Sequence, residues 1–513
     1  MNRNVFLKNT VILTGASLAL RGIGMVFRVY LAARIGAQGM GLYQLITTVY
    51  NLALTIATAG IGIAATRMIT EEMALGGGQR LRSLCKKLLL ASLVLGLLAA
   101  GLQFFGADLA AGLWIHDERA ALSLRILALS LPVIAVMSCL QGYFMARRAV
   151  GLTTGAQMAE QLLRIALIMA ILPAALGKGL GEACAAVVLA GTAAEVVSGG
   201  IVWWGYRRDL RQVPGSGKNV PAKGVLRRLW SIGAPVAATR YVGSTLRTLE
   251  NVMVPGCLAV FTGSRELALE QFGALKGMAM AVLFFPFSFL TTLSTLLLPE
   301  ITEAYAQGRQ RLLLRLISRT IGITLAVSGL MGGLFTLFAG ELGEVLFHDS
   351  QVGFYIRVLG PVMPFMYLES MVDGILKGLN QQLATFQYSI WDSIARILLI
   401  ALLAPRFGMK GFLFVMLLSN LFTGTLNLHR LLAVTGLSIR WGQWVIKPLF
   451  SFLAGMLAYR AVWLPWAAAR GLSGPLLQLV LGGGVVSLVY LVFLFLSGGL
   501  SGLGLGKTSK TMY

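Results

Sequence analysis

Apolar runs of about 20 residues recur along the whole chain and are separated by short polar or glycine-rich segments. A run of this length, wound as an α-helix, is long enough to cross the hydrocarbon core of a bilayer. Of the 513 residues, 57% are hydrophobic and 12% are charged, and the charged share is well below that of an ordinary soluble domain. The pattern predicts an all-α polytopic membrane protein with about 14 transmembrane helices.

Lysine and arginine are concentrated in alternate predicted loops, beginning with the N-terminal segment. Loops rich in these residues stay on the cytoplasmic side of a bacterial membrane, so we expect a multi-pass protein of the bacterial cytoplasmic membrane with both termini cytoplasmic. The net charge of +23 lies mostly in these short loops. It therefore indicates anionic lipid headgroups as partners, and no nucleic acid.

The chain contains an internal repeat with a constant offset. Arg125 and Pro132 in LRILALSLP correspond to Arg357 and Pro364 in IRVLGPVMP, which lie 232 residues later (357 − 125 = 232). Six predicted helices per half give both halves the same orientation, and this predicts a parallel 6+6 repeat. The predicted segments are an N-terminal six-helix lobe (1–206), a basic cytoplasmic linker (207–228), a C-terminal six-helix lobe (229–440), and two additional transmembrane helices with a tail (441–513).

The first helix of each half carries a basic stripe. Arg21 and Arg28 are seven residues apart, as are Arg240 and Arg247, so each pair lies on one helical face. Cations within the bilayer are costly unless they face protein or water. We therefore predict that the four arginines, with Lys276, line a central cavity that binds a phosphorylated group, for which the guanidinium fork is well suited. The alternative is that each arginine pairs with an intramembrane acid or extends to the membrane interface.

Three acidic residues are candidates for ion coupling. Glu250 lies three residues after Arg247 and could pair with it. Glu369 and Asp373 lie in the predicted tenth span, and only the second half carries acids at these places, so the shared fold does not require them. Asp373 could instead form a simple ion pair with Lys377.

Two further pairs of opposite charge occupy repeat-equivalent positions. Glu160 and Arg164 in the fifth span correspond to Asp392 and Arg396 in the eleventh. Side chains four apart touch on a helix, so each pair can neutralise itself within the bilayer. We predict structural ion pairs at both places.

Several classes of chemistry find no support in the chain. The tail segment GLGLGKTSK (502–510) resembles a phosphate loop, but Ser501 stands where the first glycine is required. The four cysteines have neither disulfide nor zinc spacing, and no nucleophile–base arrangement is visible. We expect no metal, no cofactor and no enzymatic activity, with a proton gradient, a sodium gradient or the membrane potential as candidate driving forces.

Two segments carry a resemblance to a known family. FLKNTVILTGASLALRGIGMVFRVYLAARIGAQGMGLYQL and TIATAGIGIAATRMITE resemble the opening of the stage V sporulation protein B branch of polysaccharide-lipid exporters. These exporters belong to the multidrug/oligosaccharidyl-lipid/polysaccharide flippase superfamily. The stretch from Gly36 to Gln44 is fairly specific to that branch, and the resemblance extends over nearly all of the chain.

The resemblance implies two six-helix lobes that alternate between inward-open and outward-open states. It implies the flipping of an undecaprenyl-diphosphate-linked sugar, a peptidoglycan or polysaccharide precursor, from the cytoplasmic to the outer leaflet. Arg21 matches the first arginine of the related lipid II flippase pattern, and Arg28 lies one residue after the place of the second. The last two helices would form a groove for the lipid tail.

Two other functions are left open by the sequence. A cation-coupled multidrug or metabolite antiporter of the same fold would need acids in the chamber, whereas the stripes found here are basic. A membrane scaffold for cell-wall synthesis enzymes would need no chamber at all. Sugar identity, the coupling ion and a role in sporulation are not encoded in any pattern that we recognise.

Overall fold

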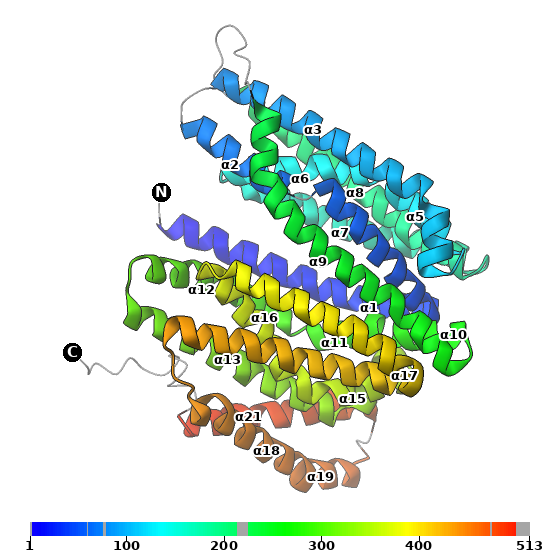
Figure 1. The fold of residues 1–513 in the computed structure, drawn as a ribbon. Coiled ribbons are helices and arrows are strands. Elements are labelled where there is room, and N and C mark those ends of the chain that lie inside the picture. The colour runs from blue at the N-terminus through cyan, green and yellow to red at the C-terminus, as the bar shows by residue number, and fades with distance from the viewer. Residues whose placement is uncertain (1–2, 59, 75–77, 213–223, 472–473, 499–513) are drawn as a thin grey trace. The chain divides into compact units, whose positions relative to one another are not determined.

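The structure is a computed structural model that describes residues 3–58, 60–74, 78–212, 224–471 and 474–498 (Figure 1). Every regular element within these ranges is a helix, and none of the described residues is in a strand. The all-α class predicted from the apolar runs is confirmed. The residues that form the phosphate-loop-like tail segment lie outside the described ranges.

The chain divides into two compact units, one made of Met1–Leu20 and Gln38–Gly256, the other of Arg21–Ala37 and Cys257–Tyr513. Helices α1 (Arg3–Thr58) and α9 (Val225–Thr262) each contribute to both units. The remaining helices of the first unit are α2 (Ile61–Ala74), α3 (Gly78–Phe105), α4 (Ala107–Leu109), the π-helix η1 (Ala110–Ile115), α5 (Ala120–Ala128), α6 (Leu131–Ala146), α7 (Val150–Leu176) and α8 (Leu180–Gln212).

The second unit holds the later helices. They are α10 (Arg265–Phe272), η2 (Gly273–Ala279), α11 (Met280–Phe284), α12 (Phe287–Ala306), α13 (Gln310–Leu337), α14 (Ala339–Phe347), α15 (Ser350–Leu359), η3 (Gly360–Val362), α16 (Met363–Gly378), α17 (Gln382–Thr435), η4 (Gly442–Ile446), α18 (Lys447–Ala458), η5 (Tyr459–Trp463), α19 (Leu464–Ala469), α20 (Pro475–Leu477), η6 (Gln478–Gly482) and α21 (Gly483–Leu496).

Two helices are long enough for more than one crossing. α1 has 56 residues and α17 has 54, and each contains one residue with non-helical backbone angles, Gly36 (φ 68°) and Gly408 (φ 59°). Positive φ at both places favours glycine. Within the described residues, nine helices are long and apolar enough to cross a membrane, or ten if the pair α5 and α6, bent by 43°, counts as one span. The exact count of fourteen stays a prediction.

The repeat is visible in the backbone as well as in the sequence. His116 and His348 lie 232 residues apart, and each ends a helix in the left-handed conformation. Arg148 and Asn380, again 232 apart, also have positive φ. These non-glycine residues rarely adopt such angles, so their recurrence at one offset supports two copies of one helical plan.

The compact units do not follow the predicted segments at every point. Residues 21–37 pack in the unit of the later helices, and residues 225–256 of α9 pack in the unit of the earlier ones. Packing units and sequence repeats are different divisions of a chain, so the predicted boundaries stay a prediction. Of the predicted linker 207–228, residues 207–212 belong to α8, α9 begins at Val225, and 213–223 lie outside the described residues.

The two additional C-terminal helical segments pack against each other and against α13. In the second unit α18 and α21 lie side by side (Figure 1). Tyr490 of α21 donates a hydrogen bond of 2.8 Å to the carbonyl oxygen of Ala326 in α13. The rings of Phe338 and Tyr459 meet edge to face with centroids 5.0 Å apart. These contacts attach the last segments to the helices of the second repeat.

Candidate substrate and coupling sites

Arg21 and Arg28 lie on one face of α1, because the helix runs without a break from residue 3 to Gly36. Arg21 Nη1 donates a hydrogen bond of 2.6 Å to Thr291 Oγ1 and another to the carbonyl oxygen of Ser288, both at the start of α12 in the same unit. Both guanidinium groups are exposed, and neither forms an ion pair with a carboxylate among the described residues. Their positive charge is therefore available to an anion.

In the first unit, α9 presents Arg240 and Arg247. The adjoining face of α9 is attached to the second part of α1 by three hydrogen bonds: Tyr241 Oη to Ile56 O (3.2 Å), Thr55 Oγ1 to Ser244 Oγ (3.2 Å) and Thr248 Oγ1 to Thr48 O (3.5 Å). Both arginines are exposed and, within the described chain, neither is paired with an acid. The basic stripe thus lies beside the face that contacts α1, and both arginine side chains remain exposed there.

The two arginine pairs belong to different compact units, Arg21 and Arg28 to one and Arg240 and Arg247 to the other. Their convergence on one cavity stays a prediction. Lys276 in η2 is half-buried, and its ammonium lies 5.7 Å from the ring centroid of Phe412. A cation over an aromatic face is stabilised by the ring quadrupole, so this contact favours the Lys276 ammonium at this place.

A half-buried acid–base cluster joins α7 and α8 in the first unit. Arg164 Nη2 lies 2.5 Å from Glu160 Oε1, as the spacing predicts, and 3.5 Å from Glu195 Oε1. Glu195 Oε2 is buried and has no hydrogen-bond partner among the described residues. With all three groups ionised, two carboxylates face one guanidinium, which leaves one unit of negative charge inside the bundle.

The repeat-equivalent pair in the second unit has a different third member. Arg396 Nη2 is bonded to Asp392 Oδ2 on the same helix, α17. Ser419, from the part of α17 beyond the break at Gly408, donates a hydrogen bond of 2.7 Å to Asp392 Oδ1. Asp392 is only 4% exposed. Asp392 thus bonds to one guanidinium and one hydroxyl, which suits a structural role, and Glu369 of α16 lies near enough to act electrostatically on both Asp392 and Arg396.

The candidate coupling acids fall into two kinds. Lys377 Nζ lies 2.5 Å from Asp373 Oδ2, so this pair is formed. Glu369 is half-buried and makes neither an ion pair nor a hydrogen bond with any residue that the structure describes. It faces α17, where a Cβ added to Gly424 would lie 3.7 Å from Glu369 Cβ. Glu250 is 3% exposed on α9 and is buried among the helices of the first unit.

The sequence-based prediction omitted Glu195, Ser419 and Asn427. Glu195 and Asn427 are 232 residues apart, so the repeat offset relates them directly. Asn427 is 2% exposed, and its Oδ1 has no hydrogen-bond partner among the described residues. Extending the repeat comparison to polar positions within apolar runs would have found this pair. Ser419 carries no comparable signal.

Metal binding finds no support in the described part of the chain. No group of three or more His, Cys, Asp or Glu side chains is placed there to hold a metal ion. The chemistry that these residues can provide is anion binding by arginine and proton or monovalent cation binding by carboxylates.

Residues 6–304 match the model of a family described as polysaccharide biosynthesis protein. Among curated relatives, Stage V sporulation protein B of Bacillus subtilis (strain 168) is 29% identical over 419 residues, 80% of either chain. Lipid II flippase MurJ of the same organism is 25% identical over 518 residues, 91% of this chain and 93% of the relative. These findings confirm the predicted resemblance.

Solved structures share the fold. Lipid II flippase MurJ in an inward closed conformation aligns with a TM-score of 0.70 at 12% identity and covers 95% of this chain and 99% of its own. An inward-facing multidrug resistance MATE family transporter of the MOP superfamily aligns with a TM-score of 0.64 at 13% identity and covers 84% of this chain and 100% of its own. A multi-pass membrane protein is therefore confirmed. The family description and the curated relative named as a lipid II flippase agree with a chain that is not an enzyme.

Proposed function

The chain belongs to the polysaccharide biosynthesis protein family, and on this basis we propose that it flips an undecaprenyl-diphosphate-linked sugar, a precursor of peptidoglycan or of another polysaccharide, across the cytoplasmic membrane. The relation to a protein named as a lipid II flippase supports this substrate class. The headgroup moves from the cytoplasmic to the outer leaflet by alternating access, while the prenyl tail remains in lipid. Binding biases the equilibrium between the two open states.

The observation that carries this proposal is the pair of basic stripes with no carboxylate partners. Arg21 and Arg28 on α1, and Arg240 and Arg247 on α9, are exposed and unpaired with acids among the described residues. A diphosphate supplies several oxygens in fork geometry, and arginine binds such groups with two parallel hydrogen bonds. Cations whose only role was structural would be expected to meet acids within the same unit.

The test is flipping by the purified full chain in vesicles that contain an undecaprenyl-diphosphate-linked sugar, measured by the accessibility of the sugar in each leaflet. We expect Arg21→Ala or Arg240→Ala to lower the rate at least tenfold, because each removes a charge-assisted contact with the diphosphate. Arg21→Lys should retain part of the rate, since it keeps the charge and loses the fork.

Arg34→Ala is the matched control, because Arg34 is exposed on the same helix, outside the predicted stripe, and lies 5.5 Å from the ring of Tyr30. Wild-type rates in both Arg21→Ala and Arg240→Ala would contradict the assignment of the binding site. Normal cell-wall synthesis in cells whose chain lacks all four arginines would favour a scaffold for cell-wall enzymes.

We propose that no cofactor is needed and that a proton gradient, a sodium gradient or the membrane potential drives transport. Glu369 is the first candidate for coupling, because it is half-buried in the bundle and forms neither a salt bridge nor a hydrogen bond with the described residues, while Arg396 and Lys377 lie near enough to act on its charge. Glu369→Gln should remove the dependence of the flipping rate on an imposed gradient, measured with and without an ionophore. Asp373→Asn, which opens an existing ion pair, is the comparison variant.

A second candidate function, cation-coupled drug antiport, is favoured by the same acid. Ethidium efflux that depends on a sodium or proton gradient and disappears in Glu369→Gln would support this function. Flipping without any ethidium efflux would reject it.

A further inference from the structure

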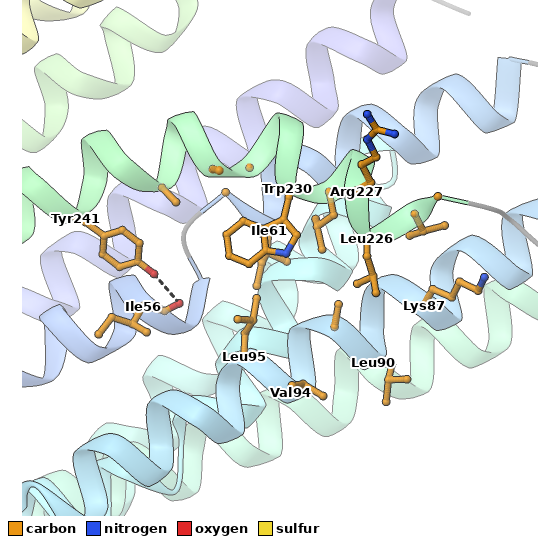
Figure 2. A pocket seen from close by; sticks show the side chains of 18 residues that line it. Ile56, Ile61, Lys87, Leu90, Val94, Leu95, Leu226, Arg227, Trp230 and Tyr241 are labelled. Atoms are coloured by element: carbon orange, nitrogen blue, oxygen red, sulfur yellow. Dashed lines mark hydrogen bonds between the residues drawn. The ribbon is translucent and has the colours of Figure 1, made fainter.

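A cavity of about 690 Å³ lies within the first unit, between α3 and the start of α9. Its volume is within the range of pockets that hold small-molecule ligands, about 300–1,000 Å³. The end of α1 and the start of α2 close one side of it (Figure 2). None of the arginines or acids discussed above lines this cavity.

Gly60 allows α9 to pack directly on the junction between α1 and α2, beside the cavity. Gly60, with φ +76°, lies in the short break between α1 and α2, and a Cβ there would come 2.5 Å from the carbonyl oxygen of Gly233 in α9. The backbone of α9 therefore rests directly on the break. Tyr241 adds a hydrogen bond of 3.2 Å to the carbonyl oxygen of Ile56. These contacts fix the wall that α9 contributes to the cavity.

The walls are apolar and accessible. Leu90 and Val94 of α3 are 61% and 47% exposed, and Leu226 and Trp230 of α9 are 59% and 62% exposed. Figure 2 shows Trp230 and Leu226 from one helix and Leu90 and Val94 from the other around the cavity. Such an apolar lining fits a hydrocarbon chain, because burial of that chain breaks no hydrogen bond of a polar group.

One end of the cavity is basic. Lys87 and Arg227 both line it, and in Figure 2 Lys87 lies at the end away from Tyr241 and Ile56, while the Arg227 side chain leaves α9 near that end and points to the side opposite Leu226. Both are exposed, and Arg227 forms no ion pair with another residue of the described chain. Both belong to loop-proximal turns that the charge pattern assigns to the cytoplasmic side. A ligand that fits therefore carries a negative group at the cytoplasmic end and an apolar chain along the walls.

We propose that this cavity binds one anionic phospholipid of the cytoplasmic leaflet. Its phosphate lies near Lys87 at the rim of the cavity, where Arg227 adds positive charge, and one acyl chain lies along the apolar walls between α3 and α9. Lysine and arginine side chains near the membrane surface attract anionic lipids, and each one increases the binding constant roughly fivefold. The cavity accommodates one acyl chain, whereas a long polyprenyl chain would enter it only in part, so a phospholipid fits the length of the apolar walls better.

The test uses the full chain in phosphatidylcholine nanodiscs that contain increasing fractions of brominated phosphatidylglycerol. Bromine quenches nearby tryptophan, and the difference between the wild type and Trp230→Phe isolates the quenching at Trp230. We expect half-maximal quenching at a mole fraction about tenfold lower for brominated phosphatidylglycerol than for brominated phosphatidylcholine. The double variant Lys87→Gln with Arg227→Gln should remove this preference.

Lys86→Gln is the matched control, since Lys86 is an exposed neighbour on α3 that does not line the cavity. It should keep the preference. Equal quenching by both lipids would overturn the proposal in favour of diffuse surface attraction. So would a loss of the phosphatidylglycerol preference in Lys86→Gln equal to that in the double variant. Displacement of the brominated lipid by equimolar undecaprenyl phosphate would overturn it in favour of the substrate. In Ala91→Phe, which adds a ring inside the cavity, quenching should fall for both lipids.

Discussion

Arg21 is held by neutral oxygens, and this determines how much charge it can offer to a ligand. Its two hydrogen bonds go to the hydroxyl of Thr291 and the carbonyl of Ser288. Such acceptors orient the guanidinium and leave its charge in place, whereas a carboxylate would orient it and also neutralise its charge. Arg164 and Arg396 illustrate the opposite case, because each is paired with an acid four residues earlier. The arginines of this chain thus fall into two groups. Those held by neutral oxygens keep their charge available to a ligand, and those paired with a carboxylate are neutralised.

The two ion-pair clusters predict different sensitivities to loss of an acid. Asp392→Asn removes a carboxylate that is 4% exposed and is bonded to both Arg396 and Ser419, which should cost about 3–5 kcal/mol of folding stability. Glu160→Gln leaves Arg164 with Glu195 at 3.5 Å, so its cost should be well under half as large. Thermal unfolding of the purified variants in detergent measures both.

Ser419→Ala serves as the control for the first variant, because it removes a hydrogen bond to Asp392 and keeps the ion pair. We expect a loss of about 1 kcal/mol there. A Glu160→Gln protein that unfolds at a lower temperature than Asp392→Asn would contradict the proposed roles of the clusters.

At the scale of elements, the two longest helices depend on a glycine at their break. Gly36 in α1 and Gly408 in α17 both have positive φ, where a side chain is strained. Their surroundings differ, since a Cβ at Gly408 would lie 2.5 Å from the ring of Phe261, and nothing lies within 4 Å at Gly36. The first break is thus constrained by backbone alone, and the second by backbone and packing.

Alanine at Gly36 and at Gly408 should separate the cost of backbone strain from the cost of the packing contact with Phe261. Gly36→Ala should cost about 1–3 kcal/mol, the strain of a side chain in this backbone region. Gly408→Ala should cost more, because Phe261 must also move. The double variant Gly408→Ala with Phe261→Ala should recover the stability that Gly408→Ala loses beyond the loss in Gly36→Ala. Unfolding temperatures measure the series, and an equal loss in both single variants would show that the contact with Phe261 is not rigid.

At the scale of the whole molecule, compact units and repeats divide the chain differently. The repeat pairs His116 with His348 and Arg148 with Asn380 at one offset. The packing of α9 through Tyr241, Ser244 and Thr248 nevertheless assigns residues 225–256 to the unit of the earlier helices. A repeat is set by chain duplication, while a packing unit is set by which side chains meet.

Orientation in the membrane is a prediction at this same scale. With Cys257 replaced by serine, the other cysteines are buried and provide a quiet background for labelling. A cysteine at Glu118 should react with an impermeant maleimide in intact cells, and a cysteine at Arg208 only after permeabilisation, because basic loops stay cytoplasmic. The reverse pattern would place both termini outside.

The all-α class, the repeat and the pairs Glu160–Arg164 and Asp392–Arg396 follow from the sequence alone. Each depends on local geometry: apolar run length sets the helices, and four residues of separation bring two side chains together on one turn. The attachment of Arg21 to α12, and the third members Glu195 and Ser419 of the clusters, were decided only by the tertiary structure. These contacts join residues far apart in the chain, and an apolar helix can present any of its faces to a neighbour until packing selects one.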